Sequence, residues 1–174
     1  MARQLWLLRH AEAEPHGSRE DSARRLTARG EEQARAAGAA LRALGVGFEA
    51  ILYSPKERAL QTAELALEGF DREVRELAGP CEPLAAGFDA AAALDLCRGL
   101  SPDGRVLLVG HEPDLSTVVA QLTGGRIDFK KGAVAVVRLE GGGGELVSLL
   151  RPRELALIAE GGAVPAAGAV RGLG

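Results

Sequence analysis

Histidine and arginine side chains follow three apolar runs of this chain within a few residues: Arg9 with His10, Arg58, and His111. Arginine offers a planar cationic fork that suits phosphate, and a neutral histidine ring is a nitrogen nucleophile or base. Together, these side chains could bind a phosphoryl group and attack its phosphorus atom. Taken singly, Arg58 could be an exposed helix charge, and His111 could be a capping or packed histidine.

The three apolar runs predict the strands that position these side chains. They span Gln4–Leu8, Phe48–Tyr53 and Arg105–Val109. Such runs are typical of strands buried on both faces of a sheet. The carboxyl ends of parallel strands meet at one edge of the sheet, where open α/β proteins bind ligands. Helices that begin at that edge add backbone N–H groups suited to an anion. We therefore expect the three segments to converge on one pocket.

Helical periodicity alternates with these runs. The spacing of apolar residues predicts helices over Thr27–Leu44, Lys56–Leu67, Ala86–Leu100, Asp114–Leu122 and Arg153–Glu160. Thr27 is suited to cap the first helix and Gly45 to end it. Ser54 is a candidate cap for the second helix, with Pro55 as its first residue.

The remaining segments complete a mixed sheet. A further short strand is expected over Glu73–Leu77, followed by a loop over Ala78–Gly87. Two runs, Ala133–Leu139 and Glu145–Leu150, flank four glycines and predict an antiparallel hairpin. The alternation of strand and helix predicts a three-layer α/β/α sandwich with a mainly parallel sheet and this hairpin near the C-terminus.

The composition of the 174-residue chain fits one domain over residues 1–160, followed by a Gly/Ala-rich tail over 161–174. A net charge of −3 argues against a general nucleic-acid surface. No apolar stretch approaches the roughly 20 residues of a membrane span. Cys81 and Cys97 fit no metal-ligand spacing, and we expect free thiols in a reducing cytoplasm. The Ala-rich helices could be buried by the sheet or by a partner, so the sequence predicts no oligomeric state.

Four motifs in order carry a resemblance to a known family. They are Arg9-His10, Leu26-Thr27-Ala28-Arg29-Gly30, the segment Ser-Pro-Lys-Glu-Arg-Ala-Leu-Gln-Thr over 54–62, and Gly110-His111-Glu112-Pro113. Across about the first 120 residues, the chain resembles the histidine phosphatase superfamily. Its short length and the opening Arg-His-Ala-Glu-Ala-Glu over 9–14 are similar to the SixA-like phosphohistidine phosphatase branch.

The resemblance implies a role for each matching residue. His10 would be the nucleophile that becomes phosphorylated, and Arg9, Arg58 and His111 would hold the phosphoryl oxygens. Arg24 would be a further pocket arginine, with Arg25 as the competing choice. Such a reaction needs positioned charge, which the arginines and a protonated His111 would supply without a metal or cofactor. We also expect one ring nitrogen of His10 to donate to a backbone carbonyl, which leaves the other free to attack.

An acid that protonates a leaving oxygen is not evident in the sequence. Glu12, Glu76 and Glu82 are candidates, and each can equally be a surface carboxylate. Because imidazole leaves a phosphoryl group with less help than an alkoxide does, this gap favours a phosphorylated histidine of a protein as substrate. The alternatives are a broad-specificity phosphomonoesterase acting on small phosphorylated substrates and a non-catalytic phosphoprotein-binding module.

Overall fold

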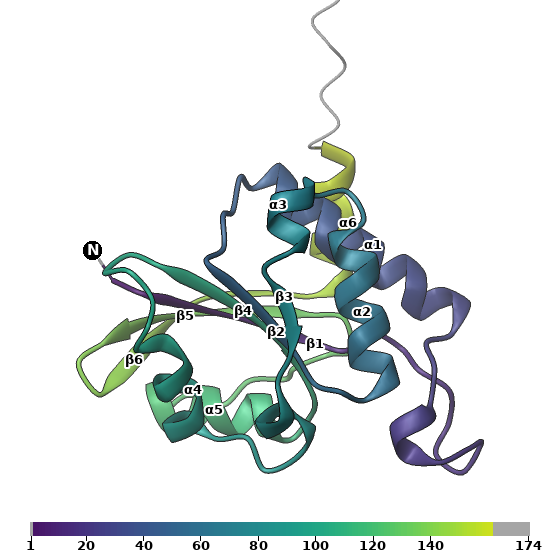
Figure 1. The fold of residues 1–174 in the computed structure, drawn as a ribbon, viewed down its shortest axis with the longest axis horizontal. Coiled ribbons are helices and arrows are strands. Elements are labelled where there is room, and N and C mark those ends of the chain that lie inside the picture. The colour runs from purple at the N-terminus through teal and green to yellow at the C-terminus, as the bar shows by residue number, and fades with distance from the viewer. Residues whose placement is uncertain (1, 162–174) are drawn as a thin grey trace, which may run out of the picture.

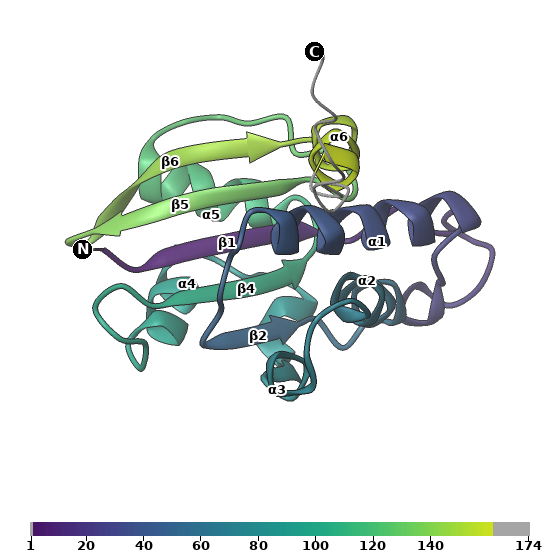
Figure 2. The same cartoon turned by 90° about the horizontal axis from the view of Figure 1, so that it is seen from above.

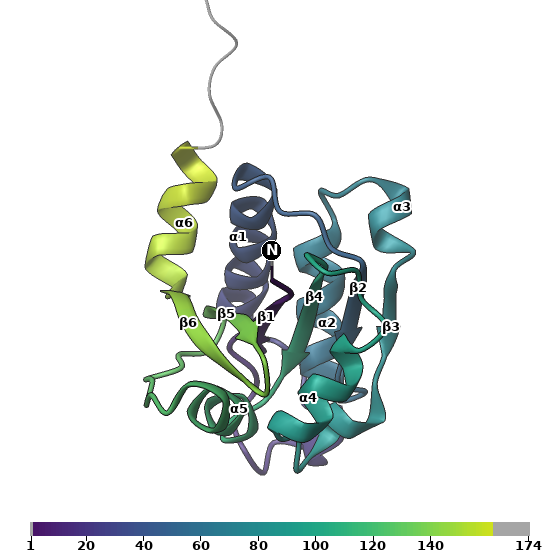
Figure 3. The ribbon, with the colours of Figure 1, turned by 90° about the vertical axis from the view of Figure 1, so that its left-hand side faces the viewer.

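In a computed structural model, which describes residues 2–161, a single six-stranded sheet lies between two layers of helices (Figures 1 and 3). One face is covered by α1 (Ala28–Ala43), α2 (Glu57–Leu67) and α6 (Pro152–Gly161). The other face is covered by α4 (Ala90–Cys97) and α5 (Asp114–Thr123). The predicted three-layer α/β/α sandwich is confirmed.

The sheet has the order β3-β2-β4-β1-β5-β6 (Figure 2). Its strands are β1 (Gln4–Arg9), β2 (Ala50–Tyr53), β3 (Ala78–Pro80), β4 (Arg105–Gly110), β5 (Val134–Glu140) and β6 (Gly143–Leu150). The first four strands pair in parallel, whereas β5 is antiparallel to both β1 and β6. The mainly parallel sheet with a C-terminal hairpin is therefore confirmed.

Strand β1 lies in the middle of the sheet and is buried from both sides. Leu5 and Leu7 pack in the core beneath α4 and α5, whereas Trp6 and Leu8 pack in the core beneath α1 and α2. Successive side chains of a strand point to opposite faces, so a continuous apolar run is what two covered faces require.

The ends of α1 follow local sequence signals. The Thr27 side chain accepts a hydrogen bond from the Gly30 N–H at 3.1 Å and caps the helix. Gly45 follows the last turn with φ of +66°, a left-handed conformation that favours glycine. Both expectations for this helix are confirmed. The Thr27 N–H also donates to the Glu12 carbonyl at 3.0 Å, which sets the start of α1 beside the loop that follows β1.

The strand expected over Glu73–Leu77 is wrong, because that segment contains the short helix α3 (Arg72–Arg75). The Arg72 guanidinium pairs with the Glu76 carboxylate at 2.6 Å, an i,i+4 contact that supports a helical turn. The strand lies one step later, in the expected loop, where β3 pairs in parallel with β2. This strand is only three residues long and has no apolar alternation that could reveal it.

Two helix starts also differ from expectation. Helix α2 begins at Glu57, and Ser54 does not cap it. The Ser54 N–H donates to the Val109 carbonyl at 3.0 Å and so extends the pairing of β2 with β4. Helix α4 begins only after Asp89, whose carboxylate accepts from the Ala92 N–H at 3.0 Å as an N-cap.

Helices α1 and α2 approach most closely at Gly38. A Cβ atom at this position would lie 1.8 Å from the Ala66 carbonyl oxygen, which belongs to the α2 backbone. We predict that Gly38→Ala forces the helices apart and lowers the free energy of unfolding by about 2 kcal/mol or more, measured by urea denaturation. Gly99→Ala is the control, because a Cβ atom there meets nothing within 4 Å. Equal midpoints for the two variants would contradict the close helix approach.

Within residues 2–161, no helix combines the length and apolar character needed to cross a membrane. The tail expected over 161–174 lies outside the described residues except for Gly161, which ends α6.

Candidate active site

The carboxyl ends of β1, β2 and β4 lie side by side at one edge of the sheet, next to the loop that links β1 to α1 (Figure 1). The His10 N–H donates to the Gly110 carbonyl at 2.9 Å, which continues the pairing of β1 with β4 beyond the strands. This register sets His10 beside His111, with ring centroids 5.2 Å apart. The parallel sheet thus brings together two histidines that are about a hundred residues apart in the chain.

His10 is buried and held in one tautomer. Its Nδ1 lies 2.8 Å from the Ala11 carbonyl oxygen, and since a carbonyl can only accept, Nδ1 carries the proton. The pKa of His10 is lowered to about 3, chiefly by burial and also by the positive charges of Arg58 and Arg9, against the opposing effect of the Ala11 bond. The ring is therefore neutral at pH 7, and Nε2 carries a lone pair. The expected bond to a backbone carbonyl is present.

His111 is also buried, and Ser54 fixes its orientation. The His111 Nε2 lies 2.7 Å from the Ser54 Oγ, and that hydroxyl in turn accepts from the Lys56 N–H at 3.3 Å. Among the described residues, the Ser54 hydroxyl proton has only His111 to receive it, so Nε2 accepts and Nδ1 carries the ring proton.

Burial lowers the pKa of His111 to about 3, and the positive charges of Arg58 and Lys56 act in the same direction. His111 is thus neutral at pH 7 in this structure, which differs from the protonated state expected from the sequence. Its Nδ1–H is nevertheless a hydrogen-bond donor.

Three of the site side chains carry buried nitrogens without a hydrogen-bond partner in the described part of the chain. They are the Nε of Arg9, the Nε of Arg58 and the Nδ1 of His111; the fourth such nitrogen in that part belongs to Arg138 on β5. Buried donors normally have partners, and unpaired ones cost free energy. These N–H groups belong to residues that neighbour His10 or act on it through their charge, and unpaired donors of this kind are suited to the oxygens of a tetrahedral anion.

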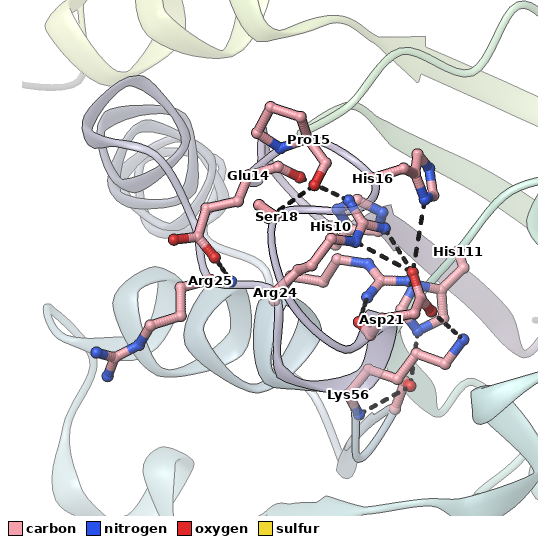
Figure 4. Close-up of polar contacts among 12 residues, drawn as sticks. His10, Glu14, Pro15, His16, Ser18, Asp21, Arg24, Arg25, Lys56 and His111 are labelled. Carbon is pink, nitrogen blue, oxygen red and sulfur yellow. Dashed lines mark hydrogen bonds and ion pairs between the residues drawn. The ribbon is translucent and has the colours of Figure 1, made fainter.

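Asp21 ties the cations of the site together (Figure 4). Its Oδ2 lies 3.1 Å from the Lys56 Nζ and 3.3 Å from the Arg58 Nη2, and its backbone carbonyl accepts from the Arg58 Nη1 at 2.6 Å. Burial raises the pKa of Asp21, but the hydrogen bonds from Lys56 and Arg24 outweigh it and the net pKa is well below its usual range. The ionised carboxylate orients Arg58 from the side.

Of the two adjacent arginines expected near the site, the structure places Arg24 there. Arg24 is buried, with its Nε and Nη2 bonded to the Asp21 carboxylate and its Nη1 donating to the Glu14 carbonyl at 2.7 Å. Arg25 is exposed, and its guanidinium is directed away from the cluster toward Glu57 (Figure 4). Each guanidinium nitrogen of Arg24 has a protein partner, so Arg24 holds Asp21 in place.

The three candidate acids lie in different settings. The Glu12 carboxylate accepts from the Thr27 hydroxyl at 2.8 Å, and Glu76 pairs with Arg72 at the end of α3. Glu82 is exposed in the short 3-10 turn Glu82–Ala85, which follows β3 at the carboxyl edge of the sheet, and it has no ion-pair partner among residues 2–161. Glu82 is thus the candidate with both the right edge and a free carboxylate.

Several supporting contacts were not predicted, although Gln61 and Thr62 belong to the 54–62 motif. The Thr62 hydroxyl accepts from the Ala11 N–H at 3.1 Å and donates to the Arg58 carbonyl at 2.6 Å, so it connects the two halves of the site. Gln61 accepts from the Leu26 N–H at 2.8 Å. Asp21 could have been noticed as the i−3 partner of Arg24. No group of three or more His, Cys, Asp or Glu in the described part could hold a metal ion.

The lowered pKa values predict an unusual pH dependence for both buried rings. In ¹⁵N NMR spectra, His10 and His111 should remain neutral with the proton on Nδ1 from pH 8 down to about pH 4. In the unfolded chain both rings bind protons near pH 6.5, whereas in the native protein they stay unprotonated until about pH 3. The free energy of unfolding should therefore fall as the pH drops from 6.5 toward 3. Titration midpoints near pH 6.5 for both rings would contradict this prediction.

Comparisons with known proteins agree with this geometry. Residues 5–82 match the model of the histidine phosphatase superfamily (branch 1). An uncharacterized protein of Picosynechococcus sp. is 34% identical over 146 residues, which cover 78% of this chain and 84% of that protein.

Solved structures of phosphatases share the fold. The protein histidine phosphatase SixA, complexed with tungstate, is 27% identical with a TM-score of 0.75, covering 87% of this chain and 99% of that one. A phosphoserine phosphatase of Entamoeba histolytica in complex with 3-phosphoglyceric acid (18% identity, TM-score 0.67, 88% and 99% covered) and an alpha-ribazole phosphatase of Shigella flexneri (22%, 0.63, 86% and 96%) match in fold. The chain belongs to the histidine phosphatase superfamily and is SixA-like.

Proposed function

We propose that this protein removes the phosphoryl group from a phosphorylated histidine of another protein, through a covalent phosphohistidine on His10. The observation that carries the proposal is the state of His10: its Nδ1 is bonded to the Ala11 carbonyl, and burial keeps Nε2 unprotonated at pH 7. A histidine buried for packing alone would not need this tautomer beside three unpaired N–H donors.

In the first step, the Nε2 lone pair of His10 attacks the phosphorus atom. A P–N bond to His10 forms while the bond to the leaving imidazole breaks, and that imidazole keeps the electron pair. It departs as a neutral ring when its other nitrogen already carries a proton. Charge on the three equatorial oxygens is met by N–H groups of Arg9, Arg58 and His111. An anion bound there favours the protonated form of His111, which is neutral without it.

In the second step, water attacks the phosphohistidine. A P–O bond forms, the P–N bond to His10 breaks, and its electron pair returns to Nε2. One proton of the water passes to solvent or to the departing phosphate. The Ala11 carbonyl holds the ring orientation through both steps, because Nδ1 keeps its proton throughout.

Two of the three candidate acids are already engaged, which supports phosphohistidine over phosphate esters as the substrate. Glu12 and Glu76 are both engaged by other side chains, whereas an ester needs an acid for its alkoxide. SixA among the similar structures is named for histidine phosphatase activity. The second candidate is ester hydrolysis, which the exposed Glu82 beyond β3 would support as the acid. The two free, buried cysteines fit a reducing compartment, so we place the reaction in the cytoplasm.

Turnover of matched substrates tests the proposal. We expect kcat/KM for a phosphohistidine peptide to exceed that for a phosphoserine peptide of the same sequence by about 100-fold or more, since general acid catalysis is worth that much. Glu82→Gln should leave phosphohistidine turnover unchanged. Equal or faster ester turnover, lost in Glu82→Gln, would establish the second candidate instead. Tight binding of the phosphopeptide without turnover would identify a binding module.

A further inference from the structure

A second pocket adjoins the candidate active site and is lined almost entirely by cations. Its volume is about 450 Å³, and its basic lining residues are Arg9, Arg29, Lys130, Lys131, Arg151 and Arg153. Among the described residues, no acidic side chain lines it. The chain as a whole carries a net charge of −3, so this concentration of positive charge is local. Such a patch raises the local concentration of an anionic partner.

The fold gathers these residues at the carboxyl edge of the sheet. Arg29 lies in the first turn of α1, the two lysines precede β5, and Arg151 and Arg153 lie where β6 passes into α6. Figure 2 shows that α6 starts at the end of β6 and lies beside α1. Because β5 is antiparallel to β1, its start lies next to the end of β1.

Arg9 belongs to both sites. Its Nη1 donates to the Phe129 carbonyl at 2.6 Å, which fixes the guanidinium against the segment that carries the two lysines. Its buried Nε has no partner among residues 2–161. An anion bound at Arg9 is therefore at the border of the basic pocket, and a larger ligand can continue from one site into the other.

The neighbouring carboxylates do not neutralise the pocket. Asp128 contacts the Lys130 Nζ at 2.9 Å and the Arg151 Nη2 at 3.5 Å, and Glu12 lies 3.8 Å from the Arg29 Nη1. Glu112 also acts on Arg9 through its charge. The Glu154 carboxylate accepts from the Arg151 backbone N–H at 2.9 Å, so four carboxylates lie near six basic side chains. Lys131 and Arg153 have no ion-pair partner in the described part of the chain.

The exposure of the cations indicates the kind of anion. The side chains of Arg29, Lys130 and Arg151 are 75%, 56% and 49% exposed, and they come from three separate segments. A second phosphate would be expected among buried, fixed donors such as those of Arg58. Exposed cations spread over a wide pocket suit several carboxylates spaced along a chain.

We propose that this basic pocket binds acidic side chains of the substrate protein that lie near its phosphorylated histidine. The proposal rests on the proposed function, because it makes the second pocket the specificity site of the same reaction. The phosphoryl group would lie among Arg9, Arg58 and the two histidines, and the acidic segment would extend past Arg9 toward Lys131 and Arg153. Contacts of this kind lower KM and are weakened by salt.

A pair of triple variants tests the pocket. The first replaces Lys130, Lys131 and Arg153 with glutamine, and the control replaces Arg72, Arg75 and Arg98 with glutamine. Both change the net charge equally, and the control residues lie in or next to α3 and α4, outside the pocket. Thermal melting should be similar for both variants, since all the replaced side chains are exposed.

Two readouts separate the pocket from the catalytic proposal. Fluorescence anisotropy with labelled hexaglutamate should show binding to the unchanged protein and the control, and roughly tenfold weaker binding to the pocket variant. The KM for a phosphohistidine peptide with glutamate neighbours should rise by a similar factor only in the pocket variant. Free phosphohistidine should be turned over equally by all three proteins.

The proposal would be overturned if hexaglutamate affinity fell equally in the pocket variant and the control, or if all three proteins bound hexaglutamate equally. Inhibition of turnover of the glutamate-flanked phosphohistidine peptide by pyrophosphate, but not by unlabelled hexaglutamate, would also overturn the proposal. The pocket would then hold a second phosphate. Selective hexaglutamate binding without any phosphohistidine turnover would instead remove the proposed function and leave the acidic-ligand site standing.

Discussion

Replacing His10 with alanine is expected to lower kcat for phosphohistidine by at least about 10⁴-fold, because the nucleophile that forms the covalent intermediate is gone. No other described side chain offers the same lone pair at this place, since the Nε2 of the adjacent His111 is engaged by Ser54. Rates measured in a single turnover report the chemical step directly. The variant should still bind the phosphorylated substrate through Arg9 and Arg58.

The matched control is His16→Ala. His16 is exposed and lies 3.7 Å from the Asp21 carboxylate, so it is near the site without being part of its buried centre. We expect its replacement to change kcat by less than about threefold. A His10→Ala protein with more than a hundredth of the original rate would contradict the covalent mechanism.

The second large effect is expected from Arg58→Gln. Arg58 is buried, and the Asp21 carboxylate and carbonyl orient its guanidinium, which leaves the Nε free for a ligand. Loss of one preorganised donor to the transition state typically costs 10²–10³-fold, and we expect a decrease of about that size in kcat/KM. Most of the loss should be in kcat, because the charge on the phosphoryl oxygens is greatest in the transition state.

Arg25→Gln is the control for Arg58. Arg25 is a nearby arginine, but it is exposed and its guanidinium pairs with Glu57. Its replacement should leave kcat/KM within about twofold, as expected for an exposed ion pair. If a folded Arg58→Gln protein kept a fifth of the original kcat/KM, then Arg58 would not stabilise the transition state.

The strands and helices that position the site could be predicted from the sequence because each carries its own signal. In the run Gln4–Leu8, the four residues after Gln4 are apolar, and these four side chains are buried on the two covered faces of β1. Since parallel strands end at a common edge, locating three strands also placed His10, Arg58 and His111 together. The short β3 has no apolar pattern of its own, because its extended conformation depends on pairing with β2.

Features that depend on side-chain environment could not be predicted. The neutral state of His111 follows from burial beside Arg58 and Lys56, which a sequence does not reveal. Ser54 looked like a helix cap, but its hydroxyl is engaged by His111. The basic pocket joins residues from four separate segments, so its charge is visible only once α6 is placed beside α1.

The most direct measurement is the capture of the phosphoenzyme. The protein is mixed with phosphohistidine substrate, quenched in alkali within milliseconds and digested for mass spectrometry. The account predicts a phosphoryl group on the peptide that contains His10, stable in alkali and lost in acid, and absent from His10→Ala. Rapid turnover with no such adduct, or an adduct on another residue, would contradict it.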